Sequence, residues 1–117
     1  MQVSEMAFDG ARPVDGYGPG FFRIAGAVHE GPVLLAGGAP AHWGGMADFD
    51  ALTALAGRAD VLIIGTGAEI APLPAADRAR IEETGLGVEV MATAPALRSY
   101  NVLLAEDRRV ALAALPL

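Results

Sequence analysis

The sequence predicts a three-layer α/β domain with a mixed central sheet, βαβ units in the C-terminal half and an N-terminal β-hairpin or meander layer. Two observations carry this prediction. Residues 61–64 are four consecutive apolar residues, three of them β-branched, and they lead into the turn Gly65-Thr66-Gly67. This pattern is typical of a strand buried on both faces, and we expect it to be the central strand. Helical and strand patterns then alternate to residue 117, as they do in βαβ units.

The first forty residues predict a β-meander that covers part of the core. Short turn signals separate its strands; these are Phe8-Asp9-Gly10, Val14-Asp15-Gly16 and Tyr17-Gly18-Pro19-Gly20. We expect residues 21–24 and 27–29 to form a hairpin around Ala25-Gly26, and residues 33–36 to add a third strand.

A glycine-rich loop over residues 37–45 contains Trp43. A tryptophan in such a loop usually packs the loop against the protein. The alternative is a partner-binding surface formed by His42 and Trp43. His29 is the only other histidine, and it does not lie at the spacing of a metal-ligand pair, so no metal site is predicted.

Two helices flank the apolar strand in the sequence. Asp48 is a suitable N-cap for a short helix that carries Leu52 and Leu55 at helical spacing and stops at Gly57. The second helix is expected over residues 75–84, with Pro74 in its first turn. Gly85 is then expected to end this helix in the left-handed conformation.

The C-terminal half completes the alternation. Residues 88–91 predict a strand that follows the second helix, which makes a right-handed βαβ unit. Thr93 is expected to cap a third helix whose Leu97, Tyr100 and Leu104 face the sheet. Residues 109–115 predict the last strand.

Composition excludes several classes of function. The 117 residues fit a single domain, 1–117, and carry a net charge of −6, which disfavours binding to nucleic acid or to an anionic membrane surface. The chain has no cysteine and no lysine, so disulfides, thiolate metal sites and Schiff-base chemistry are excluded. We find no signal peptide, transit peptide or membrane span, and we expect a cytoplasmic location.

The turn Gly65-Thr66-Gly67 does not meet the requirements of a dinucleotide fingerprint, because Ile70 stands where the third glycine belongs. A weaker prediction remains. This turn and Thr93 each follow a parallel strand, so they should meet at the sheet edge where α/β domains bind ligands. Arg98 and Asn101 are three residues apart and share a helix face. Together these residues could form an anionic-ligand site.

A structural interpretation competes with this ligand site. Asn101 and Tyr100 could instead hydrogen-bond a neighbouring loop, because buried polar groups need partners. The serines and carboxylates do not form a nucleophile–base pair or an acid–base pair in the sequence. The residues therefore predict no catalytic group and no cofactor.

Several segments, taken together, resemble a known family: Tyr17-Gly18-Pro19-Gly20-Phe21-Phe22-Arg23-Ile24, Val33-Leu34-Leu35, Trp43, residues 60–67, Pro72-Leu73-Pro74, residues 87–91, residues 98–104 and Arg108-Arg109-Val110. The chain is similar to the domain-of-unknown-function family that includes the mitochondrial assembly factor three of respiratory complex I (NADH:ubiquinone oxidoreductase). Pro32 and Ala92 depart from the pattern of this family, where serine and a polar residue are more usual. The resemblance implies a three-layer α/β fold, no established catalytic residues and, in the mitochondrial members, a role in binding other proteins.

Three hypotheses follow. The first is a non-enzymatic binding protein that assists assembly of a respiratory or other membrane-associated complex, with its partner surface on the loop that contains His42 and Trp43. The second is a small anionic-ligand domain, or an enzyme, that uses Gly65, Thr66, Gly67, Thr93, Arg98 and Asn101. The third is a homodimer formed through apolar surface.

Overall fold

The computed structural model describes residues 12–117. The predicted turn at Phe8-Asp9-Gly10 lies outside the described residues. The chain forms eight strands and three helices over this range. In order they are β1 (Val14–Gly18), β2 (Phe21–Ile24), β3 (Ala27–Glu30), β4 (Val33–Leu35), β5 (Ala41–His42), α2 (Asp50–Thr53), β6 (Val61–Gly65), α3 (Ala75–Glu82), β7 (Gly87–Met91), α4 (Thr93–Ala105) and β8 (Val110–Ala114).

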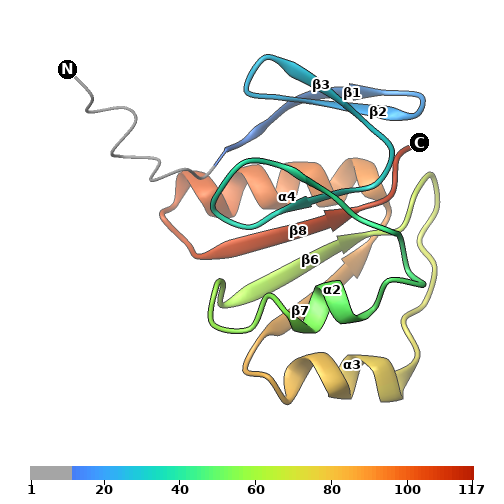
Figure 1. Ribbon diagram of the computed structural model, residues 1–117, viewed down its shortest axis with the longest axis vertical. Coiled ribbons are helices and arrows are strands. Elements are labelled where there is room, and N and C mark those ends of the chain that lie inside the picture. The colour runs from blue at the N-terminus through green and yellow to red at the C-terminus, as the bar shows by residue number, and fades with distance from the viewer. Residues whose placement is uncertain (1–11) are drawn as a thin grey trace.

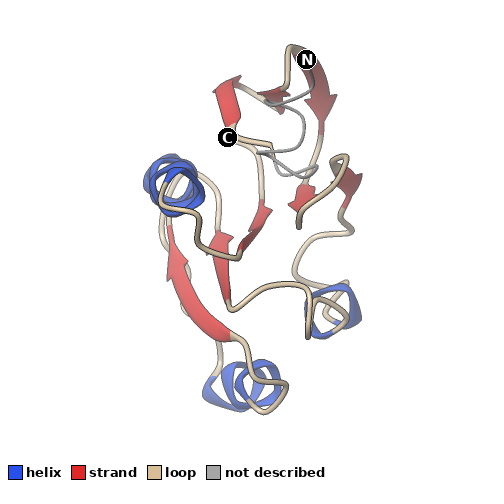
Figure 2. Cartoon of the chain, turned by 90° about the vertical axis from the view of Figure 1, so that its left-hand side faces the viewer, coloured by secondary structure: helices blue, strands red, loops and turns tan. Residues whose placement is uncertain are grey.

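The elements form the three layers that the sequence predicts (Figures 1 and 2). A five-stranded mixed sheet, in the order β5-β4-β8-β6-β7, lies in the middle. Helix α4 and the three-stranded meander β1-β2-β3 cover one face, and α2 and α3 cover the other. The mixed α/β architecture is therefore confirmed.

The central strand is β8, not β6 as the sequence suggested. Strand β8 pairs in parallel with β6 and antiparallel with β4, and all five of its residues are buried. Strand β6 lies one place away, between β7 and β8. Three of the five residues of β8 are alanines, which are poor strand formers, so composition hides its central position.

The two parallel crossovers run in opposite directions. Strand β6 leads through α3 to its neighbour β7, whereas β7 leads through α4 back across β6 to β8. Because parallel crossovers share one hand, opposite directions place the two helices on opposite faces of the sheet. This topology explains why α4 and α3 line separate cores.

The N-terminal layer differs from the predicted meander in two strands. Residues 14–18 form β1, which pairs with β2 through an irregular register between Val14 and Gly16, where the sequence suggested a turn. Strand β4 leaves the meander and pairs with β8 in the central sheet. The predicted hairpin is confirmed: Ile24 pairs with Ala27, and both turn residues, Ala25 and Gly26, have positive φ angles of 52° and 82°.

The strands alternate their side chains between two hydrophobic cores. The core under α4 and the meander is formed by Val14, Phe22, Ile24, Val33, Leu35, Ile63, Ala96, Leu97, Tyr100, Val110, Leu112 and Ala114. The core under α2 and α3 is formed by Trp43, Leu52, Leu55, Ala59, Leu62, Ile64, Ile81, Leu86, Val88, Ala111 and Ala113. Leu97 and Tyr100 face the sheet as predicted, and Leu104 packs beside them.

Neither predicted N-cap forms. Helix α2 has only four residues and begins after Phe49, because the Asp48 carboxylate instead accepts a hydrogen bond from the Gly44 amide at 3.1 Å. Helix α4 begins at Thr93 after Ala92, and the Thr93 hydroxyl bonds outside its own helix. Helix α3 follows Pro74, and Gly85 beyond its end has the expected left-handed φ of 99°. Within residues 12–117, no helix combines the length and the apolarity that crossing a bilayer requires.

Candidate functional site

The carboxyl edge of the sheet is built around Thr93. Its side chain is completely buried, and its hydroxyl accepts a hydrogen bond from the Gly67 amide at 2.8 Å and donates one to the Leu115 carbonyl at 2.7 Å. The Thr93 amide donates to the Gly67 carbonyl at 2.8 Å. One residue therefore joins the turn after β6, the start of α4 and the end of β8.

Gly65 and Gly67 allow this close approach. A Cβ atom on Gly65 would lie 2.9 Å from the Thr93 hydroxyl oxygen and 3.1 Å from the Thr93 Cα, so a larger residue would push α4 away from β6. Gly67 has a φ of +101°, which strongly favours glycine. The glycines of the turn thus serve the packing of a helix against a strand.

Thr66 organises the loop that follows. Its hydroxyl lies 2.8 Å from the Glu69 carbonyl oxygen and 3.3 Å from the Met91 carbonyl oxygen, and it accepts a hydrogen bond from the Ala71 amide at 3.0 Å. The Thr66 amide also donates to the Met91 carbonyl. The predicted ligand groups Gly65, Thr66, Gly67 and Thr93 do lie together, but their polar atoms bond to the chain itself.

Asn101 binds the N-terminal layer, and it does not join the turn. It lies eight residues beyond Thr93, or about 12 Å along the helix axis. Its side chain exchanges two hydrogen bonds with the backbone of Val14, at 2.9 and 2.8 Å. Arg98 is exposed on α4. The structural interpretation of Asn101 is therefore the observed one, although its partner is the first residue of β1 and lies 87 positions away.

Tyr100 reinforces the same connection. Its hydroxyl donates to the Arg12 carbonyl at 2.7 Å, and its ring lies in the core under the meander. Burial disfavours the charged phenolate and raises the pKa of Tyr100 to about 12. This phenol is therefore a fixed hydrogen-bond donor at neutral pH.

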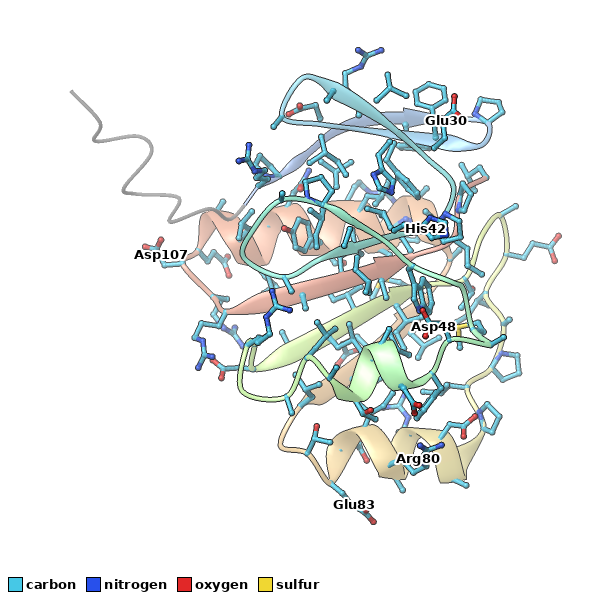
Figure 3. All side chains as sticks on the ribbon, in the orientation of Figure 1. Glu30, His42, Asp48, Arg80, Glu83 and Asp107 are labelled. Carbon is cyan, nitrogen blue, oxygen red and sulfur yellow. The ribbon has the colours of Figure 1, made fainter. Side chains whose placement is uncertain are left out.

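Trp43 anchors the glycine-rich loop. The side chain is completely buried, and its indole N–H donates to the Asp48 carbonyl at 3.2 Å. It therefore lies in the core and not on a surface that a partner could contact, which corrects the partner-binding interpretation of this residue. His42 is exposed on the edge strand β5, and its role in partner binding stays a prediction. Figure 3 labels His42, which belongs to this loop, and Asp48, which follows it in the chain.

Three ion pairs lie on the surface of the described residues. Arg78 lies 3.6 Å from Glu82, Arg80 3.8 Å from Asp50 and Arg109 3.4 Å from Asp60, all with exposed side chains. Arg78 also donates to the Val88 carbonyl of the edge strand β7 at 2.9 Å. Across the described residues, no three histidine, aspartate or glutamate side chains are grouped as metal ligands would be. The three surface ion pairs contribute little to the free energy of unfolding, because their side chains are exposed to solvent.

One surface residue was overlooked in the sequence. Ile70 lies at the tip of the loop between β6 and α3 with 64 % of its surface exposed. The available signal was a single isoleucine in the short stretch between Gly67 and Pro72, for which the sequence predicts neither a helix nor a strand. Such a residue has no place in a core, and its position in the loop explains its exposure.

The chain is similar to known proteins over nearly its whole length. An uncharacterised protein from Rhodobacter capsulatus is 53 % identical over 117 residues, which cover all of this chain and 94 % of that protein. A crystal structure from Bartonella henselae, described as an outer membrane protein, is 33 % identical with a TM-score of 0.82 and covers 93 % of this chain and 98 % of that one.

A solution structure from Bordetella pertussis, described as a Mth938-like domain, is 28 % identical with a TM-score of 0.78 and covers 94 % of this chain and 87 % of that one. These likenesses agree with the fold described above. A family model described as "Protein of unknown function (DUF498/DUF598)" matches residues 14–115. The chain therefore belongs to the DUF498/DUF598 family.

Proposed function

We propose that this protein is a non-enzymatic protein-binding module that assists assembly of a respiratory or other membrane-associated complex. Open α/β sheets usually bind small ligands at the carboxyl edge of the sheet. The observation that carries the proposal is that the polar groups at this edge already hydrogen-bond to other groups of the chain. Here the Gly67 amide, the Thr93 hydroxyl and the Leu115 carbonyl are bonded to one another. The polar groups that would recognise a small molecule already have partners.

Opening this edge for a ligand would be costly. A ligand that displaced Thr93 would leave a buried donor and a buried acceptor without partners, at about 1–3 kcal/mol each. Arg98, the one cation among the predicted ligand residues, lies exposed on α4 about 7.5 Å of helix rise beyond Thr93. These points favour recognition of another protein at the surface over capture of a small anion.

The resemblance supplies the cellular context of the proposal. The similar family includes an assembly factor of respiratory complex I, and a related structure from Bartonella henselae is described as an outer membrane protein. Both point to work beside a membrane. A second copy of this chain is also a candidate partner, and light scattering of the purified protein measures that directly.

The test uses two measurements on the full chain. The tagged protein is captured from its own host in mild detergent, with the tag alone as control, and bound proteins are identified by mass spectrometry. In parallel, membranes of a deletion strain are analysed by native electrophoresis. The proposal expects enriched subunits or assembly factors of one membrane complex, and accumulation of a smaller form of that complex in the deletion strain.

Two results would contradict the proposal. One is a tagged protein recovered without a partner, together with normal complexes in the deletion strain. The other is a large rise in the melting temperature with a small anion such as phosphate, because a ligand that binds only the folded state stabilises it. The second result would restore the ligand-binding hypothesis at the carboxyl edge.

A further inference from the structure

We propose that the partner is held by the loop between β6 and α3, with Ile70 as the anchor, and that the partner presents an apolar pocket bordered by basic side chains. This inference rests on the proposed protein-binding function and names its contact surface. In Figure 1 this loop and the C-terminus lie on the same right-hand side of the molecule. We call residues 67–71 the Ile70 loop.

The exposure of the Ile70 side chain is the first support for this contact surface. Ile70 is 64 % exposed, more than Val102 at 55 %, Val28 at 54 % or any other large apolar residue of the described chain. The neighbours Ala68, Glu69 and Ala71 are exposed as well, so the isoleucine projects from a small-residue loop. A single exposed apolar residue is common on protein surfaces, and this one is distinguished by the hydrogen bonds that hold its loop.

The Ile70 loop is fixed in shape by Thr66. The Thr66 hydroxyl bonds both sides of the tip, through the Glu69 carbonyl at 2.8 Å and the Ala71 amide at 3.0 Å. Thr93 holds the base of the loop through two hydrogen bonds to Gly67. A loop that is already ordered loses little conformational entropy on binding, which favours its use as an interaction site.

Two other exposed apolar residues adjoin chain segments that border the same sheet edge. Met46 and Leu117 are 36 % and 42 % exposed. The backbone beside each of them borders the same sheet edge, because Gly45 lies against the Leu115 side chain and Gly67 lies near the Pro116 carbonyl. An anchor with weaker apolar contacts around it is the usual arrangement of a protein interface.

Charge defines the chemistry of the partner. Residues 44–49 and 66–74 contain two ionised side chains, Asp48 and Glu69, and the cation that borders them, Arg80, lies over the Phe49 ring and pairs with Asp50. An interface with this edge would bring those carboxylates against the partner, and complementary basic groups around an apolar pocket would steer and orient it. We therefore expect binding to weaken as salt is added.

The experiment places a photo-crosslinking amino acid, p-benzoylphenylalanine, at Ala68 in the full chain expressed in its host, with the same probe at Ala105 on α4 as control. Both positions are exposed. The partner adduct is then compared in two further variants, Ile70→Ser and Val102→Ser, which remove similarly exposed apolar side chains from different surfaces. Melting temperatures confirm that each variant is folded.

We expect the probe at position 68 to form an adduct with one protein, and the probe at position 105 to form none. Ile70→Ser should lower its yield at least tenfold, as loss of an interface anchor does, whereas Val102→Ser should leave it unchanged. Thr66→Val should also lower the yield, and Thr66→Ser should restore it, because serine keeps the hydroxyl. Added sodium chloride should reduce the yield.

Contrary results separate the two proposals. Partner capture that survives Ile70→Ser, or adducts that form at 105 instead of 68, would overturn the Ile70 loop as the contact while protein binding stands. A yield that salt does not change would overturn the basic pocket. No captured protein and no adduct at either position, together with normal complexes in the deletion strain, would overturn the proposed function and this inference with it.

Discussion

The two faces of the central sheet are held by different interactions. On the face covered by α4 and the meander, Tyr100 and Asn101 add hydrogen bonds to the backbone of Arg12 and Val14, and Thr93 binds the strand ends. On the face covered by α2 and α3, buried apolar side chains around Trp43 form the contact. Both layers are packed on a filled apolar core, and the hydrogen bonds from α4 to residues 12 and 14 also fix the position of the N-terminal layer.

The largest expected effect concerns the hydrophobic core under α2 and α3. Trp43→Ala should lower the free energy of unfolding by about 3–5 kcal/mol, because it leaves a large cavity under the loop. Urea unfolding followed by circular dichroism measures this, since the variant lacks the only tryptophan. His42→Ala, at the exposed neighbouring position, is the control and should change little. Equal effects of the two variants would contradict the role of Trp43 in filling this core.

Thr93→Val tests the buried hydrogen bonds on the face that α4 and the meander cover. This change keeps the shape of the side chain and leaves the Gly67 amide and the Leu115 carbonyl without their partner. We expect a loss of about 2–3 kcal/mol in the free energy of unfolding, measured by urea titration. Thr93→Ser keeps the hydroxyl and should lose much less; a valine variant as stable as the serine variant would contradict the role of the bonds.

Alkaline pH tests the same face without a mutation. The pKa of Tyr100 rises from 10.0 to about 12 on folding because burial disfavours the phenolate. Between these values the folded protein keeps a proton that the unfolded chain has lost. Stability from this group is therefore complete below pH 10 and falls by about 2 kcal/mol as the pH rises to 12.

The composition makes this measurement clean. The chain has no lysine or cysteine and only one other tyrosine, Tyr17, which is 43 % exposed. Denaturant titrations from pH 9 to 12 should show the fall in the native chain and a much flatter profile in Tyr100→Phe. The same steep fall in both proteins would assign the alkaline transition to another cause.

The smallest expected loss of stability is confined to the meander. Asn101→Ala removes two hydrogen bonds to Val14 and should cost about 1–2 kcal/mol. Amide hydrogen exchange should become faster in β1 and β2 and stay unchanged in β6 and β8, because the meander can open as a unit. Uniformly faster exchange would mean that the meander and the sheet open together.

Local patterns predicted most of the elements. The β-branched run of β6 and the hairpin at Ala25-Gly26 follow from short stretches of sequence, and so does the helix end before Gly85. Polar side chains were harder to interpret. Thr93 and Asp48 look like N-caps, yet each binds a backbone group elsewhere.

Distant partners explain the other errors. The partner of Asn101 lies 87 residues away, and a neighbouring loop was as far as local reasoning could reach. The central place of β8 depends on the direction of the α4 crossover, which an alanine-containing strand does not reveal. Burial of Trp43 was one of two interpretations that the loop sequence allowed, and packing decided between them.

The central position of β8 also determines when the protein can fold during synthesis. The strand that joins β4 to β6 follows every other strand in the chain, so the ribosome has produced both halves of the sheet before the strand between them emerges. Until then the inner edges of β4 and β6 stay open to other chains. Folding of this domain is therefore completed only after residues 110–114 have left the exit tunnel, and premature termination would release an unclosed sheet.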